Sequence, residues 1–243
     1  MRIVRHIGLG LAIAAALVAP ALVAPALADT GAAPSPNAVV LQGGTDLSPT
    51  WTYTSLGLTY ALRGNINVSG PLVRLWGDRF TYDFEDGFTR IGATGWEHSY
   101  SFGYQFKDAK GSETLYTGYD SQSTSLSPLV KDPGEGTHGG VLYELDATRT
   151  FLGVIHANAD GGYSSTNRNY WIRGGFASGP PTHAWFGPIF SWVGNVDYHG
   201  FRSGLGLSNV RLGSHIGAQL SLGVQHIARG AGIFTGVNFV VIP

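Results

Sequence analysis

Hydrophobic and polar residues alternate along most of the chain, most clearly in residues 214–227, SHIGAQLSLGVQHI. Leu220 and Leu222 have one parity, whereas Gln219 and Gln225 have the other. Because successive side chains of a β-strand point to opposite faces, this segment predicts a strand with one apolar and one polar face. In a soluble sandwich the apolar face packs into the core, whereas in an outer-membrane barrel it contacts lipid.

The same alternation, interrupted by turn residues, continues to the end of the chain without helical periodicity. Segments of about ten residues joined by turns are typical of transmembrane β-strands. We therefore predict an all-β, antiparallel, up-and-down transmembrane β-barrel of about twelve strands over residues 38–243. The predicted strands are 38–46, 52–62, 71–83, 95–106, 113–121, 139–146, 150–159, 168–177, 183–194, 199–210, 213–227 and 231–242.

The connections between these strands alternate in length. Every second connection is short, whereas the others include two long ones. Bacterial barrels have short turns on the periplasmic rim, where both termini lie, and longer loops on the other rim. The polar long loop is either a binding surface for a polysaccharide or partner, or an ordinary surface loop. The short connections are RGNINVSG, KDAKGS, ATR, SGPPT and RLG, and the long ones are EDGFTRIGAT and SQSTSLSPLVKDPGEGTHG.

The N-terminus predicts export. Residues 1–28 begin with Arg2 and Arg5, continue as an apolar run and end in Ala-Leu-Ala, the pattern of a cleaved secretory signal peptide. Residues 29–37 form a linker rich in Pro, Ala and Ser. No later segment has 18 consecutive apolar residues, so the mature chain can span a membrane only as a closed barrel. We expect the protein in the bacterial outer membrane.

Composition supports an enclosed polar face. Gly contributes 36 of the 243 residues, about twice the usual share, and the charged fraction of 13% is about half the usual one. The polar parity of the strands carries mostly Gly, Ser, Thr, Gln and Asn, which suits a crowded barrel interior better than a water-exposed surface. Aromatic residues near strand ends are expected to form interfacial girdles, namely Trp51, Tyr53, Trp96, Tyr100, Tyr163, Tyr170 and Tyr198.

Charge and cysteine content exclude two classes of protein. Without the signal peptide, 13 basic residues stand against 16 acidic ones, which argues against a nucleic-acid partner. The chain has no Cys, so it is not a disulfide-stapled scaffold.

Charged and amide residues within the strands are the candidates for function. An Arg facing lipid at the membrane midplane costs about 2–4 kcal/mol, so these residues are expected to face inward or lie at a rim. They form either an internal salt-bridge network that stiffens the wall, or a polar channel or ligand groove. The inward rows contain few aromatic residues by this parity, which favours a scaffold over a glucan conduit. The candidates are Arg74, Asp78, Glu97, Arg173, Arg202, Gln219 and Gln225.

The sequence contains no recognisable motif for catalysis, cofactor binding or metal binding. The eight His residues lack metal-ligand spacing, and the sequence contains no HExxH motif or Asp-rich calcium loop. Asp197, His199 and Ser203 share a parity, but that row reads as lipid-facing, and no GxSxG motif is present. We expect no catalytic, cofactor or metal site. The alternatives are an outer-membrane lipid hydrolase or acyltransferase, and a soluble periplasmic oligosaccharide-binding β-protein.

Several phrases resemble the cellulose biosynthesis protein BcsS family. They occur in order as SGPLVRLWGDRFTYDF, LYTGYDSQ, KDPGEGTHGG, YWIRGGF, FGPIFSWVGNVDYHGFRSGLGL and LSLGVQHIARGAGIFTGVNF. The resemblance implies a non-enzymatic outer-membrane β-barrel accessory to cellulose or exopolysaccharide biosynthesis or secretion. It implies outer-membrane lipid as surroundings, and components of the cellulose synthase complex or a glucan chain as partners. It assigns no role to individual residues.

Overall fold

The computed structural model describes residues 38–86, 88–128, 132, 134–180, 183–195, 199–227 and 230–242. The predicted signal peptide, 1–28, and linker, 29–37, lie outside the described residues. Within these residues the chain forms twelve strands and one short 3-10 helix, η1 (Thr166–Arg168). The strands are β1 (Val39–Ser48), β2 (Trp51–Ala61), β3 (Gly70–Asp86), β4 (Thr89–Asp108), β5 (Gly111–Ser127), β6 (Gly136–Phe151), β7 (Ile155–Ser164), β8 (Tyr170–Ser178), β9 (Trp185–Gly194), β10 (His199–Arg211), β11 (Ile216–Ile227) and β12 (Gly230–Val241).

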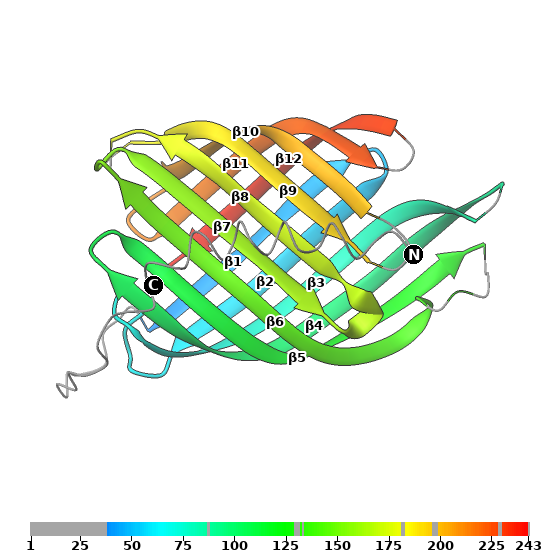
Figure 1. Cartoon of the computed structure of the whole chain (residues 1–243), viewed down its shortest axis with the longest axis horizontal. Helices are drawn as coiled ribbons and strands as arrows, with labels where there is room; N and C mark the ends of the chain where they lie inside the picture. The colour runs from blue at the N-terminus through cyan, green and yellow to red at the C-terminus, as the bar shows by residue number, and fades with distance from the viewer. Residues whose placement is uncertain are drawn as a thin grey trace, which may run out of the picture.

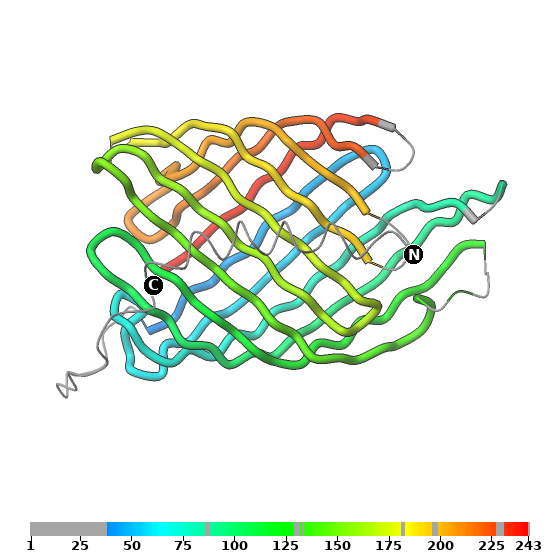
Figure 2. Tube along the Cα trace, in the orientation of Figure 1, coloured from blue at the N-terminus to red at the C-terminus, as the bar shows by residue number. Residues whose placement is uncertain are grey.

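The strands form a single closed barrel. Each strand pairs antiparallel with the next, and β12 pairs with β1 in a register that places Val241 opposite Leu41. Figures 1 and 2 show the last strand lying beside the first, which closes the ring. Closure leaves no sheet edge unpaired along the wall. The predicted twelve-stranded up-and-down barrel is confirmed.

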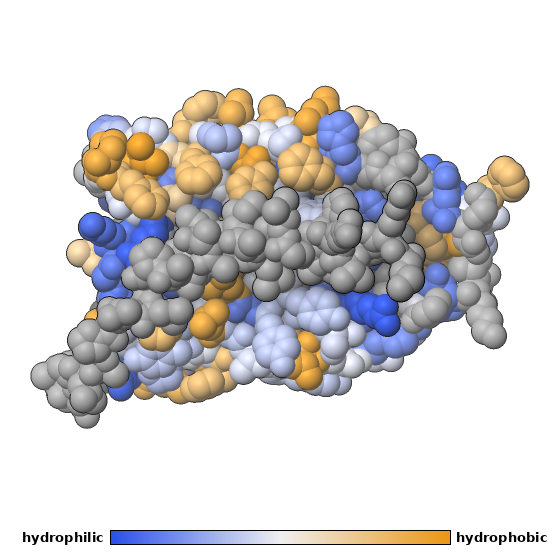
Figure 3. All heavy atoms as spheres, viewed as in Figure 1, coloured by the Kyte–Doolittle hydropathy of each residue, from blue (hydrophilic) through white to orange (hydrophobic). Residues whose placement is uncertain are grey.

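The apolar face of the strands is the outside of the barrel. On β11, Leu220 and Leu222 are 45% and 57% exposed, whereas Gln225 on the opposite parity is 2% exposed. Hydrophobic side chains gather along the upper outer wall in Figure 3. The polar parity therefore faces the interior, as the composition predicted. No helix in the described part of the chain is long and apolar enough to cross a membrane.

Three predicted connections were wrong, because most or all of their residues belong to strands. The predicted long loop, residues 121–139, is one of them, since β5 continues to Ser127 and β6 begins at Gly136. The segment EDGFTRIGAT is mostly strand, since β3 continues to Asp86 and β4 begins at Thr89. The segment ATR, residues 147–149, lies inside β6. The turn comes later, at 152–154, where Leu152 and Gly153 have φ of 52° and 71°. These positive φ values reverse the chain there, and Gly adopts them without steric cost.

The two ends of the barrel differ. We call the end where β1 begins and β12 ends the near mouth, and the opposite end the far mouth. Strands β3 to β6 contain 16 to 20 residues, whereas the others contain 9 to 13. The extra residues extend this part of the wall beyond the far mouth, as Figure 1 shows for the β3–β4 and β5–β6 hairpins.

Candidate functional site in the barrel interior

A cavity of about 390 Å³ lies inside the barrel. Its lining comes from β1 to β10 and includes aromatic, charged and amide side chains. Small-molecule sites typically have volumes of about 300–1,000 Å³ and combine apolar walls with a few placed polar groups. The cavity is therefore large enough for a ligand, and its lining is the candidate functional site.

A loop between β2 and β3 covers part of the near mouth. We call residues 62–69 the mouth loop. The side-chain amide of Gln105, which points inward from β4, donates to the backbone carbonyls of Ile66 and Val68 at 2.8 and 3.0 Å. Ile66 packs against a small buried cluster that includes Leu72 and Tyr116. The mouth loop is thus attached to the inner wall rather than to the rim alone.

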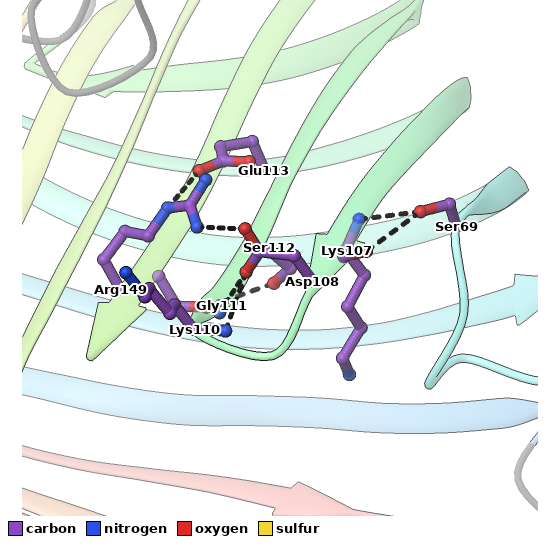
Figure 4. Close-up of polar contacts among 9 residues, drawn as sticks. Ser69, Lys107, Asp108, Lys110, Gly111, Ser112, Glu113 and Arg149 are labelled. Carbon is purple, nitrogen blue, oxygen red and sulfur yellow. Dashed lines mark hydrogen bonds and ion pairs between the residues drawn. The ribbon is translucent and has the colours of Figure 1, made fainter. Parts of the chain in front are cut away.

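Further polar contacts fasten the near mouth (Figure 4). Ser69 exchanges hydrogen bonds with the backbone of Lys107, at 3.2 and 2.9 Å, which ties the mouth loop to β4. Arg149 of β6 pairs with Asp108 and Glu113, each at 2.6 Å, so three strands are joined beside the β4–β5 turn. These contacts give the near mouth a fixed shape.

The far mouth is narrowed by apolar side chains and by a turn. Phe80, Tyr82, Phe84, Ile91, Ala93 and Leu126 form a buried cluster on the inner faces of β3, β4 and β5. The β7–β8 turn folds inward and contacts the inner face of β5. Thr166 of η1 donates to Asp120 at 2.8 Å, and Asn169 donates to Gln122 at 2.6 Å. The cavity lies between these two constrictions and the near mouth.

Two inward arginines connect strands that are not neighbours in the sheet. Arg74 of β3 pairs with Asp146 and Glu144 of β6, two strands beyond its neighbour, and its guanidinium lies 3.8 Å from the ring centroid of Tyr116. Its side chain is only 8% exposed. Since removing one partner of a buried pair leaves an uncompensated charge, this contact constrains the shape of the wall.

Arg202 makes a similar connection in another part of the barrel wall. It reaches from β10 to Asp46 of β1 at 3.1 Å and donates to Gln225 of β11 at 3.0 Å. The guanidinium lies 3.6 Å from the ring centroid of Trp51 and 4.9 Å from that of Phe234. Gln225 in turn donates to side-chain oxygens at the β1–β2 turn, at 3.0 and 3.1 Å. This network ties the first strand to the last three.

The third inward arginine is more open to the cavity. Arg173 of β8 pairs with Asp160 of the neighbouring β7 at 2.7 Å, and its side chain is 42% exposed. Asp78 lies on another wall, where it accepts hydrogen bonds from the indole of Trp76 at 2.7 Å and from the hydroxyl of Tyr53. Acidic groups predominate in the lining, with six carboxylates against three guanidiniums. They are Asp46, Asp78, Glu97, Glu144, Asp146 and Asp160, and Arg74, Arg173 and Arg202.

Inward glycines and aromatic residues face one another across neighbouring strands. At each of these glycines, an added Cβ atom would lie closer to the opposite ring than van der Waals contact allows. The ring therefore occupies the space that a side chain would need. An aromatic ring can therefore lie against the wall. The pairs are Gly57 with Trp76, Gly95 with Phe80, Gly103 with Tyr116, Gly162 with Trp171 and Gly223 with Phe234.

The cavity brings five of the seven candidate residues together. Arg74, Asp78, Glu97, Arg173 and Arg202 line it. Of the other two, Gln225 is buried in the Arg202 network, and Gln219 is half-buried opposite Asn238 of β12, outside the described lining.

Several residues of the lining were missed or misplaced by the sequence prediction. Trp51, Tyr53 and Tyr170 line the cavity instead of forming an outer girdle. Trp76 and Trp171 line it as well, so the expectation of few inward aromatic residues was wrong. The alternation of the sequence could have predicted that both tryptophans face inward. Trp76 lies on the same strand face as Arg74 and Asp78, and Trp171 lies on the same strand face as Arg173. Trp96, Tyr100 and Tyr163 lie on the outer surface as expected, and Tyr198 is outside the described residues.

The residues weighed for hydrolase chemistry do not form a catalytic group. His199 and Ser203 lie four residues apart on the outer row of β10, which on a strand separates their Cα atoms by about 13 Å. A catalytic Ser–His pair requires direct hydrogen-bond contact. Asp197 lies outside the described residues. Within the part of the chain that the structure describes, no group of three or more His, Cys, Asp or Glu side chains is placed to hold a metal ion.

A closed antiparallel barrel with apolar outer rows and a polar interior defines the class of outer-membrane-type β-barrels. Within this class, the family model of the cellulose biosynthesis protein BcsS matches residues 40–241. The chain therefore belongs to the BcsS family, and it is a barrel associated with cellulose biosynthesis. No curated protein sequence matches it significantly.

Solved structures with a similar fold are outer-membrane barrels of low sequence identity. The translocator domain of autotransporter NalP from Neisseria meningitidis aligns with a TM-score of 0.50 at 11% identity, over 97% of this chain and 95% of that one. The transport unit of autotransporter AIDA-I from Escherichia coli gives a TM-score of 0.45 at 8% identity, over 97% of both chains. The KdgM porin in complex with disordered oligogalacturonate gives 0.45 at 10% identity, over 82% and 97%.

Proposed function

We propose that the protein is a non-enzymatic β-barrel of the bacterial outer membrane that assists the biosynthesis or export of cellulose. The observation that supports this most directly is the combination of an apolar outer wall with a polar interior cavity in a chain of this family. The proposal includes export by residues 1–28, with cleavage after Ala28. Its partners are outer-membrane lipid and the glucan chain or components of the cellulose synthase complex.

The outer wall argues against a soluble periplasmic protein. Large apolar side chains are exposed on nearly every strand, among them Leu56, Trp96, Leu205, Leu222 and Ile233, each with at least half of its surface exposed. Monomeric soluble proteins rarely expose contiguous apolar patches larger than a few hundred Å². In a membrane, the same rows contact lipid and need no further cover.

The first experiment locates the protein and measures cellulose output. The full-length chain is expressed in its native host, from which the chromosomal copy of the gene has been deleted. The membranes are then fractionated, and boiled and unboiled samples are compared on a denaturing gel. We expect an outer-membrane band whose mobility changes on heating, and restored cellulose output. A soluble periplasmic band with unchanged mobility, or unchanged cellulose output in the deletion strain, would contradict the proposal.

A further inference from the structure

We propose that the cavity binds a short segment of an uncharged glycan by stacking sugar rings on Trp76 and Trp171. This inference rests on the proposed function and adds to it a ligand class and the residues that bind it. The two indoles come from walls five strands apart in the ring of twelve, and both line the same cavity.

Each of the two tryptophans is held against the wall. Trp76 lies over Gly57 of β2, and Trp171 lies over Gly162 of β7, where a Cβ on either glycine would overlap the indole. The indole nitrogen of Trp76 also donates to Asp78, which fixes the orientation of that ring. A ring held against the wall offers its other side to the cavity without losing side-chain entropy on binding.

The other glycine-paired aromatic rings are already covered. The guanidinium of Arg74 lies 3.8 Å from the ring centroid of Tyr116, and that of Arg202 lies 4.9 Å from the ring centroid of Phe234. Phe80 packs in the apolar cluster at the far mouth. Arg74 is 5.9 Å from the centroid of Trp76, at the outer limit of a cation–π contact. The two tryptophans are therefore the glycine-paired rings best placed to take a ligand.

Polar groups next to each indole suit a ligand rich in hydroxyl groups. Asp78 lies beside Trp76, and the pair of Arg173 and Asp160 lies beside Trp171. Arg173 is 42% exposed, whereas the side chains of Arg74 and Arg202 are 8% and 4% exposed. Its guanidinium is thus the most accessible of the three to a bound molecule. Apolar ring faces combined with a few directed polar groups are typical of ligand sites.

The charge of the lining decides which glycans fit. Six carboxylates face three guanidiniums, and each guanidinium is paired with at least one carboxylate inside the barrel. An anionic sugar chain would meet more acidic groups than guanidiniums in this lining, and no arginine there without a carboxylate partner. An uncharged chain does not meet this repulsion. A neutral glucan, the product of cellulose biosynthesis, has the required chemistry.

The test measures binding by the intact barrel. The full chain is purified from outer membranes in a detergent without a sugar head group, and binding of cellotetraose is measured by titration calorimetry. Trp76→Ala and Trp171→Ala are each expected to weaken binding about tenfold, the effect of losing roughly 1.4 kcal/mol of aromatic contact. The double variant should bind no measurable cellotetraose. The matched control is Trp96→Ala, since this tryptophan lies on the outer wall and is 60% exposed.

A second ligand tests the charge argument. Cellotetraose with its primary alcohols oxidised to carboxylates has the same backbone, and we expect it to bind at least about tenfold more weakly than the neutral chain. Retained heat-dependent gel mobility shows that each variant is folded. Unchanged affinity in the double variant, equal affinity for the oxidised chain, or no binding of cellotetraose by the wild-type barrel would overturn the inference. None of these outcomes affects the outer-membrane location or the cellulose output, so the two proposals fail separately.

Discussion

Replacing Leu222 with Arg tests which face of the wall contacts lipid. Leu222 is the seventh of twelve residues in β11, and it lies on the outer row opposite Leu205 and Thr235. With a rise of about 3.3 Å per residue and a tilt of about 45°, it is about 14 Å from the near-mouth end of the strand. Half of an apolar band about 25 Å tall is about 12 Å, so this side chain lies close to the membrane midplane.

At that depth, the Leu222→Arg substitution is expected to destabilise the folded barrel by about 2–4 kcal/mol. This corresponds to a roughly 30- to 700-fold shift in the folding equilibrium. The matched variant is Ile216→Arg, at the first residue of the same strand and on the same outer row. Near the interface an Arg costs only about 0–1 kcal/mol, because its side chain reaches water.

The assay is urea unfolding of the barrel in phospholipid vesicles, followed by tryptophan fluorescence and by heat-dependent gel mobility. The depth dependence is the diagnostic result, because a soluble barrel would have both positions in water. Both substitutions would then change stability by no more than about 0.5 kcal/mol. Equal and small effects at Leu222 and Ile216 would refute the assignment of the outer wall to lipid.

Three further outcomes follow from the interior contacts. Arg202→Met should destabilise the barrel by about 3–5 kcal/mol in urea unfolding, because it leaves the carboxylate of Asp46 without its counter-charge. Arg90→Ala removes a side chain that is 65% exposed and should cost at most about 1 kcal/mol; similar costs for the two substitutions would contradict this account. Gln105→Leu should release the mouth loop and increase single-channel conductance in planar bilayers, and an unchanged trace would argue against a closing role. Gly57→Val should push Trp76 off the wall and shift tryptophan emission to the red; an unaltered spectrum would show that the ring does not depend on the glycine.

The number of strands, and whether each side chain points outward or into the barrel, could be predicted from the sequence because both are local properties. Alternation over ten residues identifies a strand, and the parity of Leu220 and Gln219 separates the two faces. The mistakes lie where alternation continues through residues that resemble a turn. In residues 85–94 the strands run on to Asp86 and resume at Thr89, although the segment contains charged residues and glycines.

The composition of the cavity could be predicted only in part, because it depends on register between strands. Arg74 and Arg202 were expected to face inward, but their partners on β6 and β1 are remote in the sequence. The contacts between glycines and aromatic rings are hidden for the same reason, since Gly57 and Trp76 are 19 positions apart and meet only through the pairing of β2 with β3. A single sequence contains both residues but not the register that places them opposite each other.

Because of these glycine–aromatic contacts, the residues that tolerate substitution least in this barrel differ from those in most folded domains. In most folded domains the large buried residues are the least replaceable, and glycines outside turns can often be exchanged. In the proposed outer-membrane location, the leucines of the outer wall contact fluid lipid chains, so any apolar side chain of similar size should serve there. Gly57 and Gly162 instead complement the outline of an indole, and even a single methyl group is too large for that space. A saturation scan of this barrel should therefore find its strictest positions among its smallest residues.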